Sequence, residues 1–307
     1  MPKRMSAAEW GLLLGLAAAW GGIFLFTRVA LEGLPPVTLV AMRVGMAAPL
    51  LVALVYLQGH RLPREPSLWA AFALMGLLNN VVPFSLITWG QQTVTSGLAA
   101  ILNAMTPFAA VLVCHFFTKD ERATAAKLAG VTLGVAGVAL LIGPGALTGL
   151  GRDVAAQGAC LAATVSYAFA GLWGRRFRGL PPAVAAAGMV TCSALIMAPL
   201  ALWHDRPWTL RPSWAALEAS AAAAAIGTAL AYWLYFRILA AAGATNLLLV
   251  TVLMPPAAVT LGAVFLGERF PLTALAGMGV IFVGLAVIDG RLPALWRRST
   301  PARQPGD

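Results

Sequence analysis

The sequence predicts an all-α integral membrane protein with ten transmembrane helices, arranged as two inverted five-helix repeats. Three observations predict this class: an apolar composition, ten hydrophobic runs of membrane-spanning length, and a set of motifs that occurs twice. Of the 307 residues, 60% are hydrophobic and 10% are charged. Soluble domains carry about 25% charged residues, so this chain has too few polar groups to cover a water-facing surface.

This composition excludes a cytosolic enzyme, a soluble repeat scaffold and a nucleic-acid-binding domain. The formal net charge of +10 would by itself suggest a nucleic-acid partner. The distribution of the positive residues along the chain argues against such a partner, as described below. Cys114, Cys160 and Cys192 each lie inside an apolar run. We therefore interpret the cysteines as small buried hydrophobic residues without a disulfide or a metal.

Ten segments are long and apolar enough to span a bilayer, which requires about 20 mostly apolar residues. They lie at about 9–28, 37–57, 67–89, 94–117, 124–143, 154–174, 183–203, 213–236, 244–266 and 271–289. The connections between them are short and hold nearly all of the charges. The expected organisation is a cytoplasmic N-terminus (1–8), a first repeat (9–143), a second repeat (154–289) and a basic, disordered cytoplasmic tail (290–307).

The positive residues predict the orientation of these spans. With a cytoplasmic N-terminus, 15 of the 21 Lys and Arg residues fall on the inner side. The others lie outside or in the outer halves of helices: Arg28, Arg43, Arg152, Arg206, Arg211 and Arg269. Positive charge is retained on the cytoplasmic side, so both termini are expected inside and the excess charge requires no acidic partner.

Several motifs recur in the same order at offsets of 145 to 148 residues. Gly33-Leu34-Pro35-Pro36 returns as Gly179-Leu180-Pro181-Pro182. Further pairs are Ser67–Ala71 with Ser213–Ala216, Pro107 and Glu121 with Pro255 and Glu268, and Leu128–Gly130 with Leu275–Gly277. Each repeat contains five spans, an odd number, so the second copy must enter the membrane inverted. Inverted repeats are typical of alternating-access transporters, which bind substrate near the midplane.

These motifs resemble those of the drug/metabolite transporter superfamily, in particular its EamA-type two-repeat exporters. The resemblance covers about residues 9 to 289. It is carried by Trp20-Gly21-Gly22 with Phe24, Leu31 to Pro36 leading to Arg43, Asn103 to Pro107 leading to Glu121, and Pro255 to Arg269. Overall similarity, rather than a diagnostic motif, relates the chain to bacterial exporters of the aromatic amino-acid type. The resemblance implies a multi-pass protein of the bacterial cytoplasmic (inner) membrane.

Ionisable residues are absent from the predicted midplane. The Asp and Glu residues lie at helix ends, in loops or within about one turn of a helix end, and no histidine lies at mid-depth. The sequence therefore predicts no proton relay, no catalytic residues, no metal site and no cofactor. It disfavours a carboxylate-coupled antiporter and an intramembrane enzyme, which would need a nucleophile, base or metal cluster at depth.

Three charged residues leave two interpretations open. Arg43, two turns into the second span, is expected either to bind a substrate carboxylate or to reach outward and bond helix carbonyls. Its counterpart in the second repeat lies near Met189. Glu121 and Glu268 each lie where one helix ends and the next begins. They are expected to complement the N-terminus of the following helix or to take part in gating.

The candidate substrate-binding residues combine mid-depth position with polarity, aromaticity or helix kinking. Asn79 and Asn80 serve either a binding site or interhelical hydrogen bonding, and their repeat counterparts are expected at alanines near Ala224 and Ala225. The prolines produce either a cavity-lining kink or a static one. The full set is Trp20, Asn79, Asn80, Pro83, Asn103, Pro107, Tyr167, Tyr232 and Trp233.

The sequence therefore predicts a transporter that exports small amphipathic metabolites by alternating access, with aromatic and other hydrophobic amino acids as substrates. The expected partners are a small-molecule substrate and the lipid bilayer. A multidrug or quaternary-ammonium exporter is the alternative, weakened by the lack of a midplane carboxylate. A passive channel lined by neutral groups is a further alternative.

Overall fold

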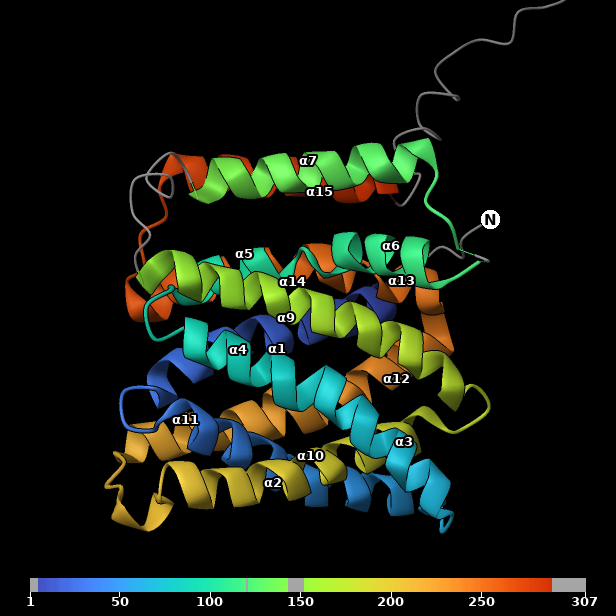
Figure 1. Ribbon diagram of the computed structural model, residues 1–307, viewed down its shortest axis with the longest axis vertical. Coiled ribbons are helices and arrows are strands. Elements are labelled where there is room, and N and C mark those ends of the chain that lie inside the picture. The colour runs from blue at the N-terminus through green and yellow to red at the C-terminus, as the bar shows by residue number, and fades with distance from the viewer. Residues whose placement is uncertain (1–4, 120, 143–151, 289–307) are drawn as a thin grey trace, which may run out of the picture. The chain divides into compact units, whose positions relative to one another are not determined.

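The computed structural model describes residues 5–119, 121–142 and 152–288. The basic tail expected at 290–307 and residues 1–4 of the expected N-terminal segment lie outside the described residues. In the described part of the chain, every regular element is a helix. The elements shown in Figure 1 are α1 (Ala7–Ala30), α2 (Pro36–Leu57), α3 (Pro66–Gly76), η1 (Leu77–Val81), α4 (Val82–Gly90), α5 (Ser96–Asn103), α6 (Thr106–Phe117), α7 (Ala125–Ile142), α9 (Arg152–Gly174), η2 (Arg175–Phe177), α10 (Pro182–His204), η3 (Pro207–Thr209), α11 (Trp214–Ala224), η4 (Ala225–Leu230), α12 (Ala231–Ala242), α13 (Ala244–Leu247), α14 (Val250–Leu266) and α15 (Leu272–Ile288).

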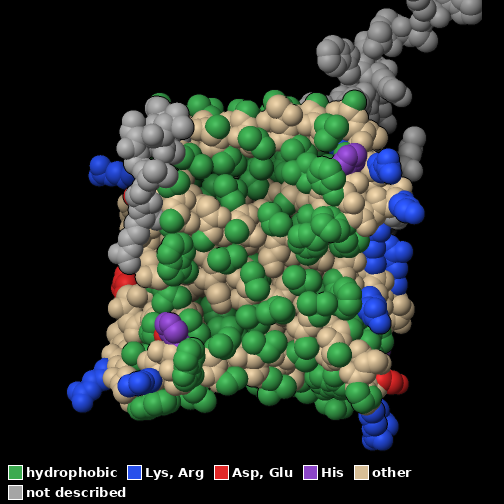
Figure 2. Space-filling view, viewed as in Figure 1, with side chains coloured by type: hydrophobic (Ala, Val, Ile, Leu, Met, Phe, Trp, Pro, Cys, Tyr) green, Lys and Arg blue, Asp and Glu red, His purple; other side chains and the backbone are tan. Residues whose placement is uncertain are grey.

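These helices confirm the all-helical fold class and account for all ten predicted spans. Eight helical segments of the described chain are long and apolar enough to cross a membrane, and α14 and α15 are apolar helices of 17 residues each. On the face shown in Figure 2, apolar side chains predominate, and Lys and Arg gather at the edge where α3 begins and α9 ends. Such a surface suits a lipid environment with charged groups at the helix ends.

The repeated Gly-Leu-Pro-Pro motif starts the second helix of each half. Pro36 and Pro182 each occupy the first turn of their helix. Proline is suited to this position because the first N–H groups of a helix have no intrahelical acceptor. Gly179 has a φ of +96°, a conformation that favours glycine. The proline therefore starts α2 and α10 in the same way, whereas Gly33 of the first copy does not share the positive φ of Gly179.

A π-helical segment interrupts the third span of each half. In η1 the Val82 N–H bonds to the Leu77 carbonyl, and in η4 the Ala231 N–H bonds to the Ile226 carbonyl. Each bond reaches five residues back, where an α-helix reaches four. The two segments begin 148 residues apart, at Leu77 and Ala225. Because π segments occur frequently at functional sites, they direct attention to the middle of these two spans.

The fourth and ninth spans are broken helices. Between α5 and α6 the chain forms a turn at Ala104 and Met105. Pro107 has no N–H to donate to the Asn103 carbonyl four residues earlier, and its ring would clash with that carbonyl in a continuous helix. The chain turns similarly between α13 and α14. Pro49, Pro199, Pro255 and Pro256, by contrast, lie inside continuous helices.

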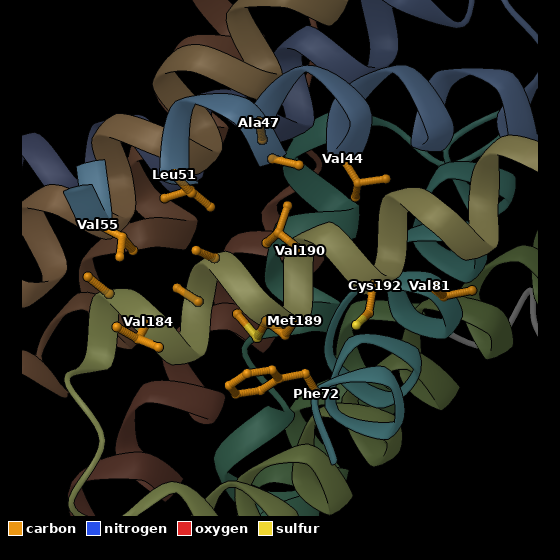
Figure 3. Close-up of a cluster of buried hydrophobic side chains, with 14 of the residues drawn as sticks. Val44, Ala47, Leu51, Val55, Phe72, Val81, Val184, Met189, Val190 and Cys192 are labelled. Atoms are coloured by element: carbon orange, nitrogen blue, oxygen red, sulfur yellow. The ribbon is translucent and has the colours of Figure 1, made fainter. Parts of the chain in front are cut away.

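The described residues form two compact units. The described residues of the first unit are 5–104 and 152–269. One hydrophobic cluster of this unit packs α2 against α10, which run antiparallel: Val55 lies near Val184, and Val44 lies toward the Cys192 end (Figure 3). Phe72 of α3 is fully buried in the same cluster, where a Cβ on Gly188 would clash with its ring.

The described residues of the second unit are 105–119, 121–142 and 270–288, and they contain α6, α7 and α15. Helices α7 and α15 approach at two pairs of glycines. A Cβ on Gly130 would lie 2.9 Å from the Gly284 carbonyl oxygen, and one on Gly137 would lie 2.9 Å from the Gly277 carbonyl oxygen. The two helices are therefore antiparallel and pack backbone to backbone, as small residues allow.

Candidate functional site

A polar cluster surrounds η1 in the middle of the third span. The Asn80 amide nitrogen donates to Ser193 Oγ of α10 at 2.9 Å, and Asn80 is 1% exposed. The Asn79 amide nitrogen lies 3.3 Å from Asn80 Oδ1, 3.5 Å from the Tyr232 hydroxyl and 3.8 Å from Met189 Sδ. Three spans therefore contribute to one polar cluster: the third, the seventh and the eighth.

Ser166 explains how the helix tolerates Pro83, which lies just after η1. In the π register, the residue five positions before Pro83 is Leu78, whose carbonyl cannot receive a bond from a proline nitrogen. Ser166 Oγ of α9 donates to that carbonyl at 2.7 Å. A partly buried carbonyl at membrane depth, which would cost free energy if left unpaired, is thus satisfied by a neighbouring helix.

Arg43 belongs to the same region, although the predicted set of site residues omits it. Its Nε donates to Thr228 Oγ1 of η4 at 3.3 Å, and its guanidinium carbon lies 3.8 Å from the centroid of the Phe84 ring. Arg43 is 7% exposed, so it does not reach outward to water. It lies within electrostatic range of the Tyr167 and Tyr232 hydroxyl groups.

Three of the four predicted aromatic residues pack against two hydrophobic clusters. Trp20 and Trp233 pack against a cluster of α1 and α12, and the Trp233 ring lies 4.9 Å from the Arg237 guanidinium carbon. Tyr232 packs against the cluster of α2 and α10 and stacks on Phe236 at 5.9 Å. A row of rings joins the two clusters. The ring centroid of Trp20 lies 5.9 Å from that of Tyr235, which lies 5.5 Å from the ring centroid of Phe236.

The structure thus brings Asn79, Asn80 and Tyr232 into contact, with Tyr167 and Arg43 close by. Pro83 follows directly after η1, and Trp20 is connected to this group through the row of rings. Asn103 ends α5, and Pro107 lies in the first turn of α6 in the second unit. Sequence reasoning noted the charge of Arg43 but could not identify its partner, which lies 185 residues away.

A pocket of about 340 Å³ lies on the α9 side of η1. It is lined by Leu78, Phe169, Leu172, Trp173 and Arg176. The Arg176 guanidinium carbon lies 5.3 Å from the centroid of the Trp173 ring. The pocket thus touches η1 through Leu78 but contains none of the predicted binding residues.

Two carboxylates of the second half cap helices of the first half. Glu268 accepts bonds from the Ser96 N–H at 2.7 Å, the Ser96 hydroxyl at 3.0 Å and the Gly97 N–H at 3.1 Å, at the start of α5. Asp205 accepts bonds from the Thr38 N–H at 2.7 Å and the Thr38 hydroxyl at 2.8 Å, at the start of α2. Hereafter these two contacts are called the carboxylate latches.

The Glu268 latch corrects the expectation that this residue complements the helix that follows it. Gly267 adopts a φ of +64°, and the Glu268 N–H bonds back to the Gly262 carbonyl at 3.1 Å. The chain therefore turns sharply after α14, and the carboxylate reaches α5 instead of the start of α15. The free N–H groups at either helix start would attract a carboxylate equally, so the turn decides which one is bound.

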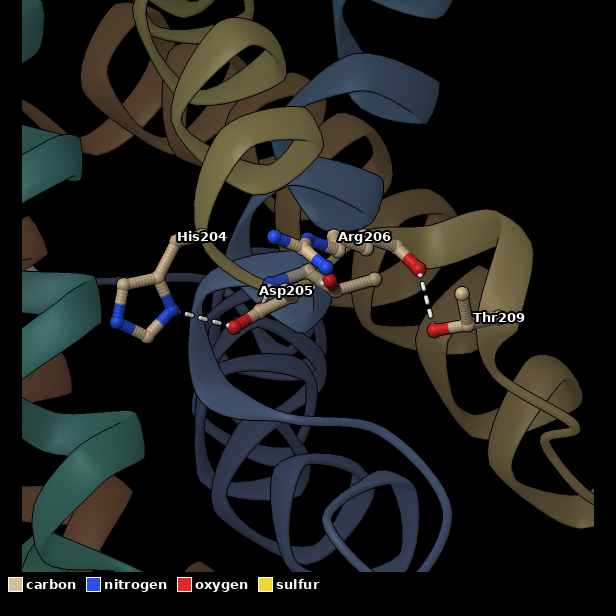
Figure 4. Close-up of polar contacts among 5 residues, drawn as sticks. His204, Asp205, Arg206 and Thr209 are labelled. Atoms are coloured by element: carbon tan, nitrogen blue, oxygen red, sulfur yellow. Dashed lines mark hydrogen bonds and ion pairs between the residues drawn. The ribbon is translucent and has the colours of Figure 1, made fainter.

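Asp205 lies just after α10, where it also bonds His204 Nδ1 at 2.7 Å (Figure 4). Burial raises the pKa of the Asp205 carboxyl. The hydrogen bonds with His204 and Thr38 outweigh that effect and hold the pKa below its ordinary value. The carboxylate is therefore ionised at neutral pH and suited to cap a helix N-terminus.

Comparison with known proteins matches this chain twice to the EamA-like transporter family, over residues 9–143 and 156–289. The chain belongs to this family. The two matched segments correspond to the two halves predicted from the repeated motifs. A solved crystal structure with 20% sequence identity covers 96% of this chain and 100% of its own, with a TM-score of 0.68, and this likeness shows the fold.

Three relatives illustrate the range of the family. The protein PagO of Salmonella typhimurium is 33% identical over 40% of each chain. The uncharacterized inner membrane transporter YedA of Escherichia coli is 31% identical over 54% of this chain and 53% of its own. A "Probable terminal-alkyne amino-acid exporter" of Streptantibioticus cattleyicolor is 31% identical over 45% of this chain and 46% of its own. The chain spans about half the length of the curated relatives it matches.

Proposed function

We propose that this EamA family member is an inner-membrane transporter that exports small amphipathic metabolites by alternating access, with aromatic and other hydrophobic amino acids as substrates. The observation that carries the proposal is the polar cluster held between the two halves at their π segments. Asn79 and Asn80 of the first half bond to Met189 and Ser193 of the second, and Thr228 of the second half bonds to Arg43 of the first. Substrate sites of inverted-repeat transporters lie between the halves at this depth.

The reciprocity of these contacts supports an inverted relation of the two repeats. Met189 is the repeat counterpart of Arg43, and Thr228 lies 148 residues after Asn80. The π segment of each half therefore contacts the second helix of the other half at the equivalent position. A two-fold axis that exchanged the halves would produce this pattern.

The glycine contacts of the second unit give independent support. Gly277 lies 147 residues after Gly130, and Gly284 lies 147 residues after Gly137. Gly130 packs on Gly284, and Gly137 packs on Gly277. Exchanging the repeats therefore turns each of these two contacts into the other. Because α7 and α15 are antiparallel, the relating axis lies across the helices, as an inverted repeat requires.

The carboxylate latches support alternating access. Asp205 and Glu268 join the halves at the end where α2 and α5 begin, which the distribution of Lys and Arg places outside. Opening this end requires the latches to break, and their bonds would be exchanged for bonds to water. The latches therefore support the proposal that this conformation is closed at the outer end.

Neutral and aromatic groups around η1 favour an amphipathic substrate. Tyr232 and Phe236 offer ring faces, and Asn79 offers an amide. Among the described residues, no Asp or Glu contacts this cluster, which weighs against a quaternary-ammonium substrate. The name of the Streptantibioticus relative supports an amino-acid substrate.

Counterflow in proteoliposomes tests the proposal. Vesicles loaded with unlabelled phenylalanine should take up labelled phenylalanine transiently above equilibrium, because a carrier exchanges substrate across the membrane. A passive channel gives no such overshoot. Counterflow with a quaternary ammonium compound but not with any amino acid would support the multidrug alternative and contradict this proposal.

The proposed orientation has a separate test. Single cysteines placed at Leu62 and Thr209 lie in connections that should face the cytoplasm and the outside, respectively. A membrane-impermeant thiol reagent applied to intact cells should label position 209 and spare position 62. Labelling of both positions from one side would contradict the inverted repeat.

A further inference from the structure

Arg43 is a buried cation at membrane depth. It lies seven residues after Pro36, the first residue of α2, and therefore about 10 Å along the helix axis at 1.5 Å per residue. It is 7% exposed. A charged side chain so placed is costly and usually pairs with an opposite charge or serves a function.

No described residue provides an opposite charge for Arg43. A guanidinium has five N–H donors, and the described residues offer one hydrogen-bond acceptor, Thr228 Oγ1. None of the described carboxylates forms an ion pair with it. The remaining contacts are neutral: the Phe84 ring lies against the guanidinium, and the Tyr167 and Tyr232 hydroxyls lie within electrostatic range.

We propose that Arg43 binds the carboxylate group of the substrate, so that the substrate supplies the missing negative charge. This inference rests on the proposed transport function and narrows its substrate class to amphipathic carboxylates. Thr228 and Phe84 hold two sides of the guanidinium, and the free N–H groups remain for a bidentate bond. Arginine suits this geometry because its planar fork matches the two oxygens of a carboxylate.

The surroundings of Arg43 match the rest of such a substrate. Phe84, Tyr232 and Phe236 provide apolar ring surface near the carboxylate position. An α-ammonium group would meet neutral acceptors, such as the Asn79 side-chain oxygen or the tyrosine hydroxyls. A purely cationic substrate would instead be repelled by the buried guanidinium.

The position equivalent to Arg43 in the second half is Met189, which carries no charge. Of the two equivalent positions that contact the π segments, one therefore carries a cation and the other does not. A substrate with one charged end and one apolar end would accordingly bind in a single orientation. An uncharged or symmetric cavity would not impose such an orientation.

Competition against labelled phenylalanine counterflow tests this assignment. The competitors are matched in ring and length: phenylalanine, 3-phenylpropionate, phenylalaninamide and phenethylamine. In the wild type, the two carboxylates should compete at concentrations about 10- to 100-fold lower than the amide and the amine, the range expected for hydrogen bonds to a charged group. In Arg43→Gln the preference for the carboxylate competitors should fall to within about twofold, because the charge that binds the carboxylate is removed.

Two further variants separate a binding role from a structural one. Arg43→Lys keeps the charge without the fork and should retain part of the preference. Arg211→Gln removes an exposed arginine from the connection after α10 and should leave the preference unchanged. Because Arg43 is an uncompensated buried charge, Arg43→Gln should be at least as resistant to thermal unfolding as the wild type. A lower Tm together with an unchanged preference would show a structural role and overturn the proposal.

A second readout keeps this inference distinct from the transport proposal. In detergent, 3-phenylpropionate should raise the Tm of the wild type and not that of Arg43→Gln, whereas phenylalaninamide should affect both equally. This result without any phenylalanine counterflow would reject the proposed amino-acid export and retain the carboxylate site. Equal effects of the carboxylate and the amide on the wild type would reject the site itself.

Discussion

Glu268 and Ser96 lie 172 residues apart, yet the Glu268 carboxylate accepts hydrogen bonds from both the backbone N–H and the hydroxyl of Ser96, at 2.7 and 3.0 Å. A side chain from the second half thereby completes the first turn of a helix in the first half. Helix capping and the proposed closure of the outer end thus involve the same carboxylate. Any motion that separates the halves at this end leaves the first N–H groups of α5 to water.

The substitution Glu268→Gln should weaken this latch without unfolding the protein. A glutamine still accepts one hydrogen bond but loses the charge that favours a helix N-terminus, a change of about 0.5–2 kcal/mol. Hydrogen exchange at the amides of Ser96 and Gly97 should accelerate by about 2- to 30-fold. Glu218, an exposed carboxylate of α11, provides the matched control, and Glu218→Gln should leave this exchange unchanged. Equal hydrogen exchange in the wild type and in Glu268→Gln would contradict a role for this latch in gating.

The Asp205 latch should depend on pH. Its pKa is lower in the folded protein than the ordinary value, so it contributes stability above that ordinary value, about 3.9. This contribution is lost as the pH falls through the folded pKa. Asp205→Asn should therefore have a lower Tm than the wild type at pH 7 and at pH 5, and the two curves should approach each other only as the pH falls below the ordinary value and through the folded pKa. A difference that stays constant over the whole acid titration would show that ionisation of Asp205 contributes nothing.

The glycine pairs of α7 and α15 predict a position-specific loss of stability. A Cβ on Gly277 would lie 2.6 Å from the Gly137 carbonyl oxygen, whereas a Cβ on Gly279 would have no neighbour within 4 Å. Gly277→Ala should therefore cost about 1–3 kcal/mol, as expected for overpacking. Gly279→Ala should be neutral or stabilising by up to about 1 kcal/mol, because alanine favours helix. Unfolding in detergent measures both, and equal effects would contradict the close approach of α7 and α15.

The fold was predictable because its signals are local. Membrane spans require only runs of apolar residues, and the Gly-Leu-Pro-Pro motif specifies the start of α2 and α10 by its own chemistry. The breaking of the fourth span follows from Pro107, whose missing N–H acts four residues earlier. The site was less predictable because its contacts are distant in sequence: Asn80 meets Ser193 across 113 residues, and Arg43 meets Thr228 across 185.

The repeat counterpart of Asn80 shows how a local irregularity defeats sequence alignment. The offset of 146 residues between Ser67 and Ser213 places Ala225 and Ile226 opposite the two asparagines. The π segments begin 148 residues apart, two more than these serines, and this spacing places Thr228 opposite Asn80. A π segment leaves no mark in hydropathy because it changes the register of the hydrogen bonds and not the apolar character. The equivalence of Asn80, which bonds to Ser193, and Thr228, which bonds to Arg43, could therefore be recognised only in the structure.

Trp20→Ala should reduce transport of aromatic substrates per folded molecule. Trp20 joins the row of rings that leads through Tyr235 and Phe236 to Tyr232, so its loss removes ring surface from one end of the proposed cavity. We expect a reduction of about 5- to 150-fold in the rate of phenylalanine counterflow, since truncating a well-placed aromatic commonly costs about 1–3 kcal/mol. Asn79→Ala should reduce the same rate, because it removes the amide that meets Tyr232.

Trp10 provides the control for this prediction, because it lies on the same helix as Trp20 but is 42% exposed near the start of α1. Trp10→Ala should leave counterflow per folded molecule within about twofold of the wild type, as expected for a surface residue away from the site. Rates are compared after normalising to monodisperse protein, which separates transport from folding. If Trp20→Ala and Asn79→Ala both transport at the wild-type rate, these side chains serve packing alone. The cavity would then lie elsewhere, and the 340 Å³ pocket beside Leu78 and Trp173 would be the next position to substitute.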